Sequence, residues 1–190
     1  MKNLRFAVPK EARVALITGG ARGLGRAIAL RLAFEGRDIA IVDLREEEAA
    51  CTVREIETTG VKAVFIKTDV TDVDAVRACV ENVYRQFSRI DILVCSAGIL
   101  GLEAPFMEQS SAQFDQVMRV NVYGTYNAHQ ATIPYMLQKG WGRCLTISSG
   151  ARHGSPNQIP YSVSKGAIFS FIRSLGNAYP KQGVFVNGVE

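Results

Sequence analysis

Short apolar runs alternate with longer segments of helical periodicity along the whole chain. The apolar runs, which predict strands, are Val14–Thr18, Ile39–Asp43, Ala63–Thr68, Ile92–Ser96, Cys144–Ser148 and Val184–Val189. The segments between them, which predict helices, are Gly23–Glu35, Glu46–Thr58, Asp72–Phe87, Ser111–Leu137 and Pro160–Tyr179. Nearly continuous apolar strands separated by helices are typical of a parallel sheet covered on both faces. The pattern therefore predicts a doubly wound, three-layer α/β fold.

Two of the predicted helices carry their own start signals. Thr71 to Asp74 and Ser110 to Gln113 both resemble capping boxes. No repeat, low-complexity tract or linker rich in proline and glycine interrupts the chain, so we expect residues 1–190 to form a single domain. The chain stops one residue after Val184–Val189, which favours a missing remainder over a naturally short sheet.

Composition narrows the class of protein. A hydrophobic content of 47% and a charged content of 21% are ordinary for a soluble globular protein. The net charge of +4 is spread along the chain without a basic run, which argues against a nucleic-acid partner. With two histidines and no C-x-x-C pair, we expect neither a metal site nor a disulfide framework, but reduced thiols at Cys51, Cys79, Cys95 and Cys144.

The N-terminus does not read as a targeting segment. Met1 to Arg5 is basic, but no long apolar stretch follows it, as a signal peptide would require. No apolar run in the chain approaches the ~18 residues that suggest a membrane span. We therefore expect a cytoplasmic protein without a membrane partner.

A glycine-rich turn joins the first predicted strand to the first predicted helix, over Thr18 to Gly25. Glycines in this setting let the backbone approach a pyrophosphate at the positive end of a helix. We expect Gly19 to make the turn, Gly23 to allow the close approach, and Gly25 to permit tight contact between helix and strand. A purely steric role for these glycines is the alternative.

Asp43 ends the second predicted strand, about twenty residues after the glycine turn. An acid there can hydrogen-bond the ribose hydroxyls of an adenosine and would repel a 2′-phosphate, which favours NAD over NADP. Arg22 and Arg45 could offset that repulsion. The alternative for Asp43 is an ordinary residue of the turn that ends the strand.

Tyr161 and Lys165 stand four residues apart, on one face of the last predicted helix. An ammonium beside a phenol favours loss of the phenol proton. The spacing alone also fits two exposed helix side chains. Its meaning depends on the motifs that precede it.

Taken together, these motifs make the chain similar to the short-chain dehydrogenase/reductase family over essentially all 190 residues. The family's Thr-Gly-x-x-x-Gly-x-Gly corresponds to Thr18 to Gly25, and its Tyr-x-x-x-Lys to Tyr161 and Lys165. Its acid after the third strand corresponds to Asp69, followed by Val70. Its Asn-x-x-Gly corresponds to Asn121 to Gly124.

The resemblance implies an NAD(P)-dependent oxidoreductase, with NAD preferred, that interconverts a secondary alcohol and a ketone. Tyr161 would be the general acid/base, and Lys165 would favour its phenolate and bind the nicotinamide ribose. Asn121 would hold a water that relays protons from Lys165, and Asp69 would meet the adenine. The implied cofactor contacts are Gly19, Arg22, Gly23, Leu24, Gly25, Asp43, Asp69, Val70, Ala97, Gly98, Tyr161 and Lys165.

Two departures from the family pattern bear on the site. Cys95-Ser96-Ala97-Gly98 stands where the family has Asn-Asn-Ala-Gly, which predicts weaker support of the cofactor wall. The catalytic serine is Ser149 by alignment of the fifth strand and Ser148 by distance from Tyr161. We favour Ser149, because a loop absorbs a deletion more easily than a strand shifts its register.

The resemblance also implies that the last strand and a substrate lid follow residue 190, and that the protein is a homodimer or homotetramer. A catalytically weak or inactive dinucleotide-binding protein is the main alternative, and a pure interaction module is a third. We assign His129 to the surface of the long fourth helix rather than to the chemistry.

Overall fold

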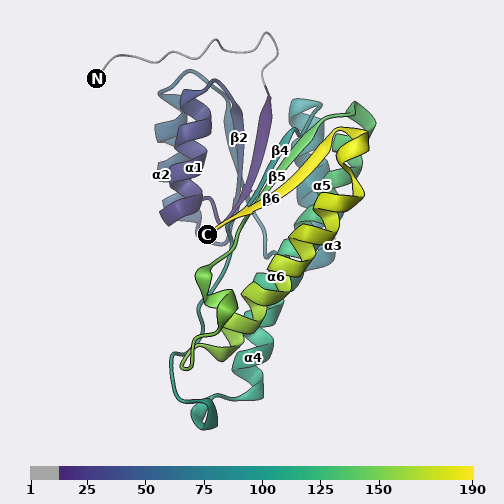
Figure 1. Ribbon diagram of the computed structural model, residues 1–190. Coiled ribbons are helices and arrows are strands. Elements are labelled where there is room, and N and C mark those ends of the chain that lie inside the picture. The colour runs from purple at the N-terminus through teal and green to yellow at the C-terminus, as the bar shows by residue number, and fades with distance from the viewer. Residues whose placement is uncertain (1–12) are drawn as a thin grey trace, which may run out of the picture.

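Six parallel strands form one sheet within residues 13–190, the part of the chain that the computed structural model describes (Figure 1). The strand order is β3-β2-β1-β4-β5-β6, and the doubly wound α/β fold predicted from the sequence is confirmed. The basic segment that begins at Met1 and was predicted not to be a signal peptide lies outside the described residues. The strands are β1 (Val14–Thr18), β2 (Asp38–Asp43), β3 (Ala63–Lys67), β4 (Ile92–Cys95), β5 (Gly142–Ile147) and β6 (Val184–Val189).

Helices cover the sheet on both sides: α1 and α2 pack on one face, and α3, α5 and α6 on the other (Figure 1). Except within the predicted helix Ser111–Leu137, their ends agree with the sequence prediction to within two residues. The α-helices are α1 (Gly23–Phe34), α2 (Glu46–Glu57), α3 (Val73–Phe87), α4 (Ser111–Met118), α5 (Gly124–Lys139) and α6 (Ile159–Ala178). Single turns of 3₁₀-helix are η1 (Phe106–Glu108), η3 (Gly150–His153) and η4 (Pro180–Gln182).

The central strand β1 explains why the apolar runs are continuous rather than alternating. All five of its residues are buried. Val14 and Leu16 face the core under α3, α5 and α6, whereas Ala15 and Ile17 face the core under α1 and α2. A strand with helices on both faces buries every side chain, and each large one contributes about 1.5–3 kcal/mol.

The predicted helix Ser111–Leu137 is not one uninterrupted α-helix, which corrects the sequence prediction. A wider turn of π-helix, η2 (Arg119–Tyr123), separates α4 from α5. Two tertiary contacts accompany this turn: Asn121 is buried and turned toward the chain after β4, and Gly124 packs so closely on Val70 that a Cβ would lie 2.6 Å from its Cγ2. Turns of π-helix are frequent at functional sites, and hydrophobic periodicity does not reveal them.

The two predicted capping boxes have different outcomes. Ser110 and Gln113 form the predicted box at the start of α4, with both reciprocal hydrogen bonds present. The box at Thr71 is wrong by one residue, because Asp72 is the N-cap of α3. Its carboxylate accepts hydrogen bonds from the amides of Asp74 and Ala75. An aspartate satisfies these amides as well as a threonine would, so the sequence signal was ambiguous.

None of the helices within residues 13–190 is long and apolar enough to cross a bilayer.

Candidate functional site

A cavity of about 660 Å³ opens at the carboxyl edge of the sheet. It lies where the strand order reverses between β1 and β4, the place at which doubly wound sheets bind ligands. Its volume is in the range of small-molecule and cofactor sites. Of the residues predicted to contact a cofactor, the cavity is lined by Gly19, Arg22, Gly23, Leu24, Asp43, Asp69, Val70, Ala97, Gly98, Tyr161 and Lys165.

Each of the three glycines in the turn after β1 is required for a different structural reason. Gly19 has a φ of +69°, and a Cβ there would lie 2.6 Å from the Ala97 amide nitrogen. Gly25 does not line the cavity; a Cβ on it would lie 2.1 Å from the carbonyl oxygen of Gly19. Gly23 has a φ of +56° and open space where its Cβ would be, on the cavity wall. Gly19 and Gly25 thus shape the turn, whereas Gly23 leaves room for a ligand.

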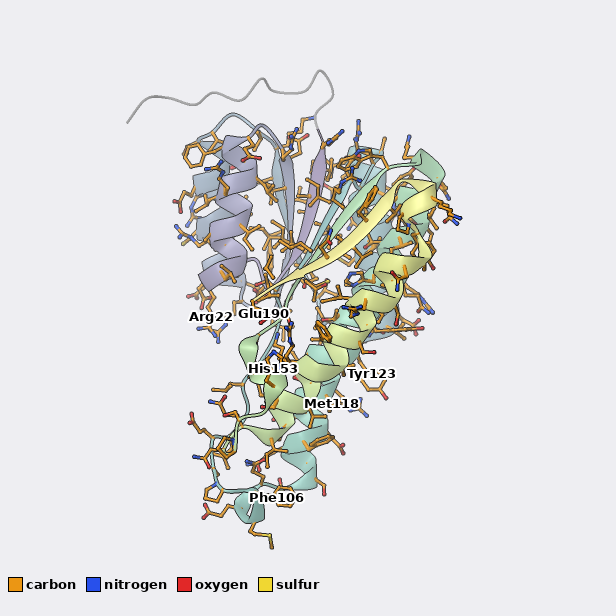
Figure 2. All side chains as sticks on the ribbon, in the orientation of Figure 1. Arg22, Phe106, Met118, Tyr123, His153 and Glu190 are labelled. Carbon is orange, nitrogen blue, oxygen red and sulfur yellow. The ribbon has the colours of Figure 1, made fainter. Side chains whose placement is uncertain are left out.

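The N-terminus of α1 faces this space without a competing anion of its own. Arg22 is the N-cap, and within the described residues no side chain caps the helix and no acid lies in its first turn. The first amides of a helix lack partners inside the helix and favour an anion. Figure 2 shows Arg22 at the carboxyl edge of the sheet. The glycine turn and this uncapped helix start therefore fit a pyrophosphate.

Asp43 joins the end of β2 to the glycine turn. Its Oδ2 accepts a hydrogen bond from the Ala21 amide at 3.1 Å, and its Oδ1 accepts one from the Leu44 amide at 2.8 Å. The carboxylate is thus fixed in the cavity wall and also acts as a turn residue, so the two interpretations of Asp43 are compatible. Arg45 beside it forms an ion pair with Glu48 at 3.1 Å.

Asp69 lies farther along the same cavity wall, after β3. Its Oδ1 accepts a hydrogen bond from the Thr71 amide at 2.9 Å, which orients the carboxylate at the start of the segment before α3. Val70 lines the cavity next to it. Asp43 and Asp69 therefore lie on the part of the wall formed by the end of β2 and the segment after β3.

Lys165 is buried in the opposite wall, with 6% of its surface exposed. Its Nζ donates a hydrogen bond to the Ile147 carbonyl at 2.7 Å and lies 5.4 Å from the centre of the Tyr161 ring. Burial lowers the pKa of Lys165 to about 8. The structure thus brings the predicted phenol and ammonium together in one cavity, with the ammonium anchored to the end of β5.

Asn121 does not line the cavity but supports it from behind. Its Oδ1 accepts a hydrogen bond from the Ile99 amide at 2.8 Å, and its Nδ2 donates to the Ile99 carbonyl at 2.9 Å and to Ser164 Oγ at 3.0 Å. Ser164 Oγ in turn donates to the Tyr161 carbonyl at 2.7 Å. Ser164 was not predicted from the sequence, because a serine inside a helix carries no signal of a tertiary partner. The water relay predicted for Asn121 stays a prediction.

Ser148 and Ser149 follow β5, and neither lines the cavity. Ser148 is buried, its amide donates to the Val189 carbonyl at 2.7 Å, and its Oγ has no hydrogen-bond partner among residues 13–190. Ser149 is half-buried and extended, and its Oγ accepts a hydrogen bond from the Ala151 amide at 3.2 Å. Side chains alternate along extended backbone, so Ser149 points to the same side as Ile147, which lines the cavity.

His129 is buried in the core, with 1% of its surface exposed, so its assignment to a helix surface is wrong. Its Nδ1 donates to the Thr125 carbonyl at 2.8 Å, and burial lowers its pKa to about 4, which keeps the ring neutral. Cys95 Sγ lies 3.6 Å from the same nitrogen. Cys95, where the family has an asparagine, is therefore accommodated by a core histidine and not by the cofactor wall. Its neighbour Ser96 does line the cavity.

No group of three or more His, Cys, Asp or Glu side chains within residues 13–190 is arranged to hold a metal ion.

The family model described as short chain dehydrogenase matches residues 13–190. The chain therefore belongs to the short-chain dehydrogenase family, and the resemblance read from its motifs is confirmed. The prediction of a dehydrogenase/reductase of this family is confirmed by the same match and by the names of its relatives.

Two curated relatives match nearly the whole chain. The 2-dehydro-3-deoxy-L-rhamnonate dehydrogenase (NAD(+)) of Sphingomonas sp. (strain SKA58) is 37% identical, over 97% of this chain and 73% of the relative. The short-chain reductase protein NovJ of Streptomyces niveus is 38% identical, over 96% of this chain and 69% of the relative.

Solved structures agree with these relatives. An NAD+-bound xylitol dehydrogenase has a TM-score of 0.91 and 34% identity, over 93% of this chain and 68% of the other. A short chain dehydrogenase from Mycobacterium paratuberculosis bound to NAD has a TM-score of 0.91 and 33% identity, over 95% of this chain and 72% of the other.

Proposed function

We propose that the chain is an NAD-dependent oxidoreductase that interconverts a secondary alcohol and a ketone, with Tyr161 as general acid/base. One observation carries the proposal: the buried ammonium of Lys165 and the ring of Tyr161 share a cavity with the glycine turn. A phenol and a cation in a partly water-excluded site are suited to proton transfer at a carbonyl or hydroxyl oxygen.

In the oxidation direction the Tyr161 phenolate accepts the hydroxyl proton of the substrate. The Lys165 ammonium, 5.4 Å from the ring centre, favours that phenolate electrostatically. NAD, when bound, supplies the hydride acceptor at C4 of its nicotinamide. In the reduction direction Tyr161 returns the proton to the carbonyl oxygen.

We assign the hydrogen bond that orients the substrate oxygen to Ser149. The extended backbone at Ser149 and its alternation with Ile147, on the cavity wall, support this choice over the buried Ser148. The hydroxyl of Ser149 accepts a bond from the Ala151 amide and keeps its own proton for a substrate oxygen.

The preference for NAD rests on Asp43. Its carboxylate is held on the cavity wall by backbone amides, where it would accept bonds from ribose hydroxyls and repel a 2′-phosphate. The ion pair of Arg45 with Glu48 reduces the positive charge available to offset that repulsion. The name of the Sphingomonas relative, which specifies NAD(+), and the NAD-bound structure from Mycobacterium paratuberculosis are in accord with this preference.

We further propose that the protein associates with itself through α5 and α6. Aromatic and apolar side chains are exposed along these two helices: Tyr126 is 47% exposed, Val163 is 43% exposed and Phe169 is 36% exposed. The Tyr126 ring on α5 lies 5.9 Å, centre to centre, from the Phe171 ring on α6, so the two helices are neighbours here, and exposed apolar groups on neighbouring helices favour a protein partner. Light scattering after gel filtration would measure the assembly, and a monomer at micromolar concentration would contradict this part of the proposal.

The proposed acid/base role is tested with Tyr161→Phe, which removes the reacting hydroxyl and keeps the ring. NADH formation is followed with xylitol, cyclohexanol and 2-butanol as probes, and NAD affinity is measured by calorimetry. Loss of a general acid/base lowers turnover by about 10²- to 10⁴-fold. NAD affinity should change by no more than about twofold, because the ring and Lys165 remain.

Tyr123→Phe, on an exposed tyrosine of η2, is the matched control and should keep full turnover. Near-normal activity of Tyr161→Phe would refute the assigned role. Binding of NAD by the unaltered protein without turnover of any alcohol or ketone would instead support the inactive dinucleotide-binding alternative.

A further inference from the structure

Two loops extend beyond the carboxyl edge of the sheet, and they are joined to each other. The first, residues 99–110, follows β4; the second, residues 148–158, follows β5 and leads into α6. Figure 2 shows Phe106 of the first loop and His153 of the second below Arg22 and Glu190, past the ends of the strands. The first loop also reaches the cavity, because Ile99 and Leu100 line it.

Gln109 and Ala104 make the junction between the loops. The Ala104 amide donates a hydrogen bond to the Asn157 carbonyl at 3.0 Å. Gln109 Nε2 donates to the Ala104 carbonyl at 2.6 Å and to the same Asn157 carbonyl at 3.2 Å. One side-chain amide thus binds a backbone carbonyl in each loop, and Gln109 and Asn157 lie 48 residues apart in the sequence.

The chemistry of the partners fixes the orientation of this amide. Both groups that it meets are carbonyl oxygens, so the nitrogen must face them and the oxygen must face away. Gln109 Oε1 is buried and has no hydrogen-bond partner among residues 13–190. The side chain leaves one acceptor unpaired while its amide group binds one carbonyl in each loop, Ala104 in the first and Asn157 in the second, so linking the loops is its structural role.

The junction is connected to Tyr161 from both directions. Asn157 stands four residues before Tyr161, at the entry to α6. At the other end of the first loop, Ile99 is held by the amide of Asn121, and that amide donates to Ser164, which bonds the Tyr161 carbonyl. The first loop is therefore fastened at both ends to the segment that carries Tyr161.

We propose that Gln109 is a positioning residue that makes the two loops move as one unit and so sets how the substrate meets Tyr161. The expected effect on the substrate rests on the proposed function, whereas the coupling of the two loops does not. Gln109 touches neither the cavity nor a reacting group. Its effect would pass through the loop backbones, which predicts a change in substrate KM rather than in kcat.

Gln109→Met tests the proposal, because methionine fills the same space without donors. Hydrogen–deuterium exchange is measured on the NAD-saturated protein, with no substrate needed. We expect exchange about tenfold faster in residues 100–109 and 152–158 together, since the shared hydrogen bonds are lost. KM and kcat are then measured with whichever of xylitol, cyclohexanol and 2-butanol is oxidised fastest. KM should rise about tenfold, whereas kcat should stay within about twofold of the unaltered protein.

Two control variants separate this role from general loop damage. Gln116→Met makes the same change on the exposed side of α4. Asn157→Ala removes a side chain but keeps the carbonyl that accepts both bonds. Both should retain the exchange rates and the KM of the unaltered protein.

Faster exchange in residues 100–109 alone would overturn the proposal, as would an unchanged KM in a Gln109→Met protein that turns over. If the unaltered protein oxidised no alcohol, the proposed function would fail, yet exchange in the two loops would still decide whether Gln109 couples them. The two failures are therefore distinguishable.

Discussion

Lys165→Met should remove a pH dependence of stability that the wild-type protein carries. The unaltered lysine is 6% exposed, and burial lowers its pKa from 10.5 to about 8. Methionine has a similar volume and shape and no charge, so it fills the site without a cavity. The substitution thus isolates the effect of the buried ammonium on folding.

The sign follows from proton binding. Below about pH 8 both the folded and the unfolded chain hold the Lys165 proton, and the folded protein bears the full cost of a buried charge. Between about pH 8 and 10.5 the unfolded chain binds more protons, so the free energy of unfolding rises with pH. The difference in pKa corresponds to a loss of about 3 kcal/mol in the free energy of unfolding at low pH. About 2 kcal/mol of this loss should be regained between about pH 7 and about pH 9.5.

The assay is urea denaturation of wild type and Lys165→Met at both pH values, which cancels the titration of groups common to the two proteins. Wild type should gain about 2 kcal/mol relative to the variant as pH rises. Lys181→Met, at an exposed lysine in η4, should show no such difference. Equal pH dependence in wild type and Lys165→Met would refute the reasoning that burial lowers the lysine pKa.

Four further substitutions test residues in and around the cavity. Gly25→Ala should lower the free energy of unfolding, measured by urea denaturation, by about 2 kcal/mol or more, because its Cβ would lie 2.1 Å from the Gly19 carbonyl oxygen. A variant as stable as wild type would contradict this close contact. Asp43→Asn keeps an acceptor for the Ala21 amide but removes the charge, so the ratio of NAD to NADP affinity, measured by calorimetry, should fall about tenfold; an unchanged ratio would exclude Asp43 as its cause. Ser149→Ala should lower kcat/KM by about tenfold or more and Ser148→Ala by much less, since a hydrogen bond to the reacting oxygen is lost only in the first; the reverse order in steady-state assays would transfer the role to Ser148.

Features that depend on neighbours along the chain were predictable. The continuous apolar runs identified each strand, and the glycine turn between strand and helix identified the part of the cavity wall that Gly19 and Gly23 line. The spacing of Tyr161 and Lys165 placed both on one helix face, as the structure has them. Each of these signals lies within a few residues of the group it describes.

Features that depend on distant partners were missed or mistaken. The π turn at Asn121 accompanies a contact with Ile99, 22 residues away, and the buried position of His129 reflects packing beside Cys95, 34 residues away. Helical periodicity cannot distinguish such a turn. His129 was assigned to a surface because no partner stands near it at metal or triad spacing in the sequence.

By itself, the sequence determined the order of strands and helices, the glycine turn and the phenol–lysine pair, because local geometry and hydrophobic burial set them. Only the tertiary structure decided what surrounds that pair: the Ile147 carbonyl that anchors Lys165, the alternation that turns Ser149 toward the cavity side, and the Gln109 bridge between two loops. These depend on which backbone groups meet after the parallel sheet closes, and a hydrogen bond between segments 48 residues apart has no counterpart in local pattern.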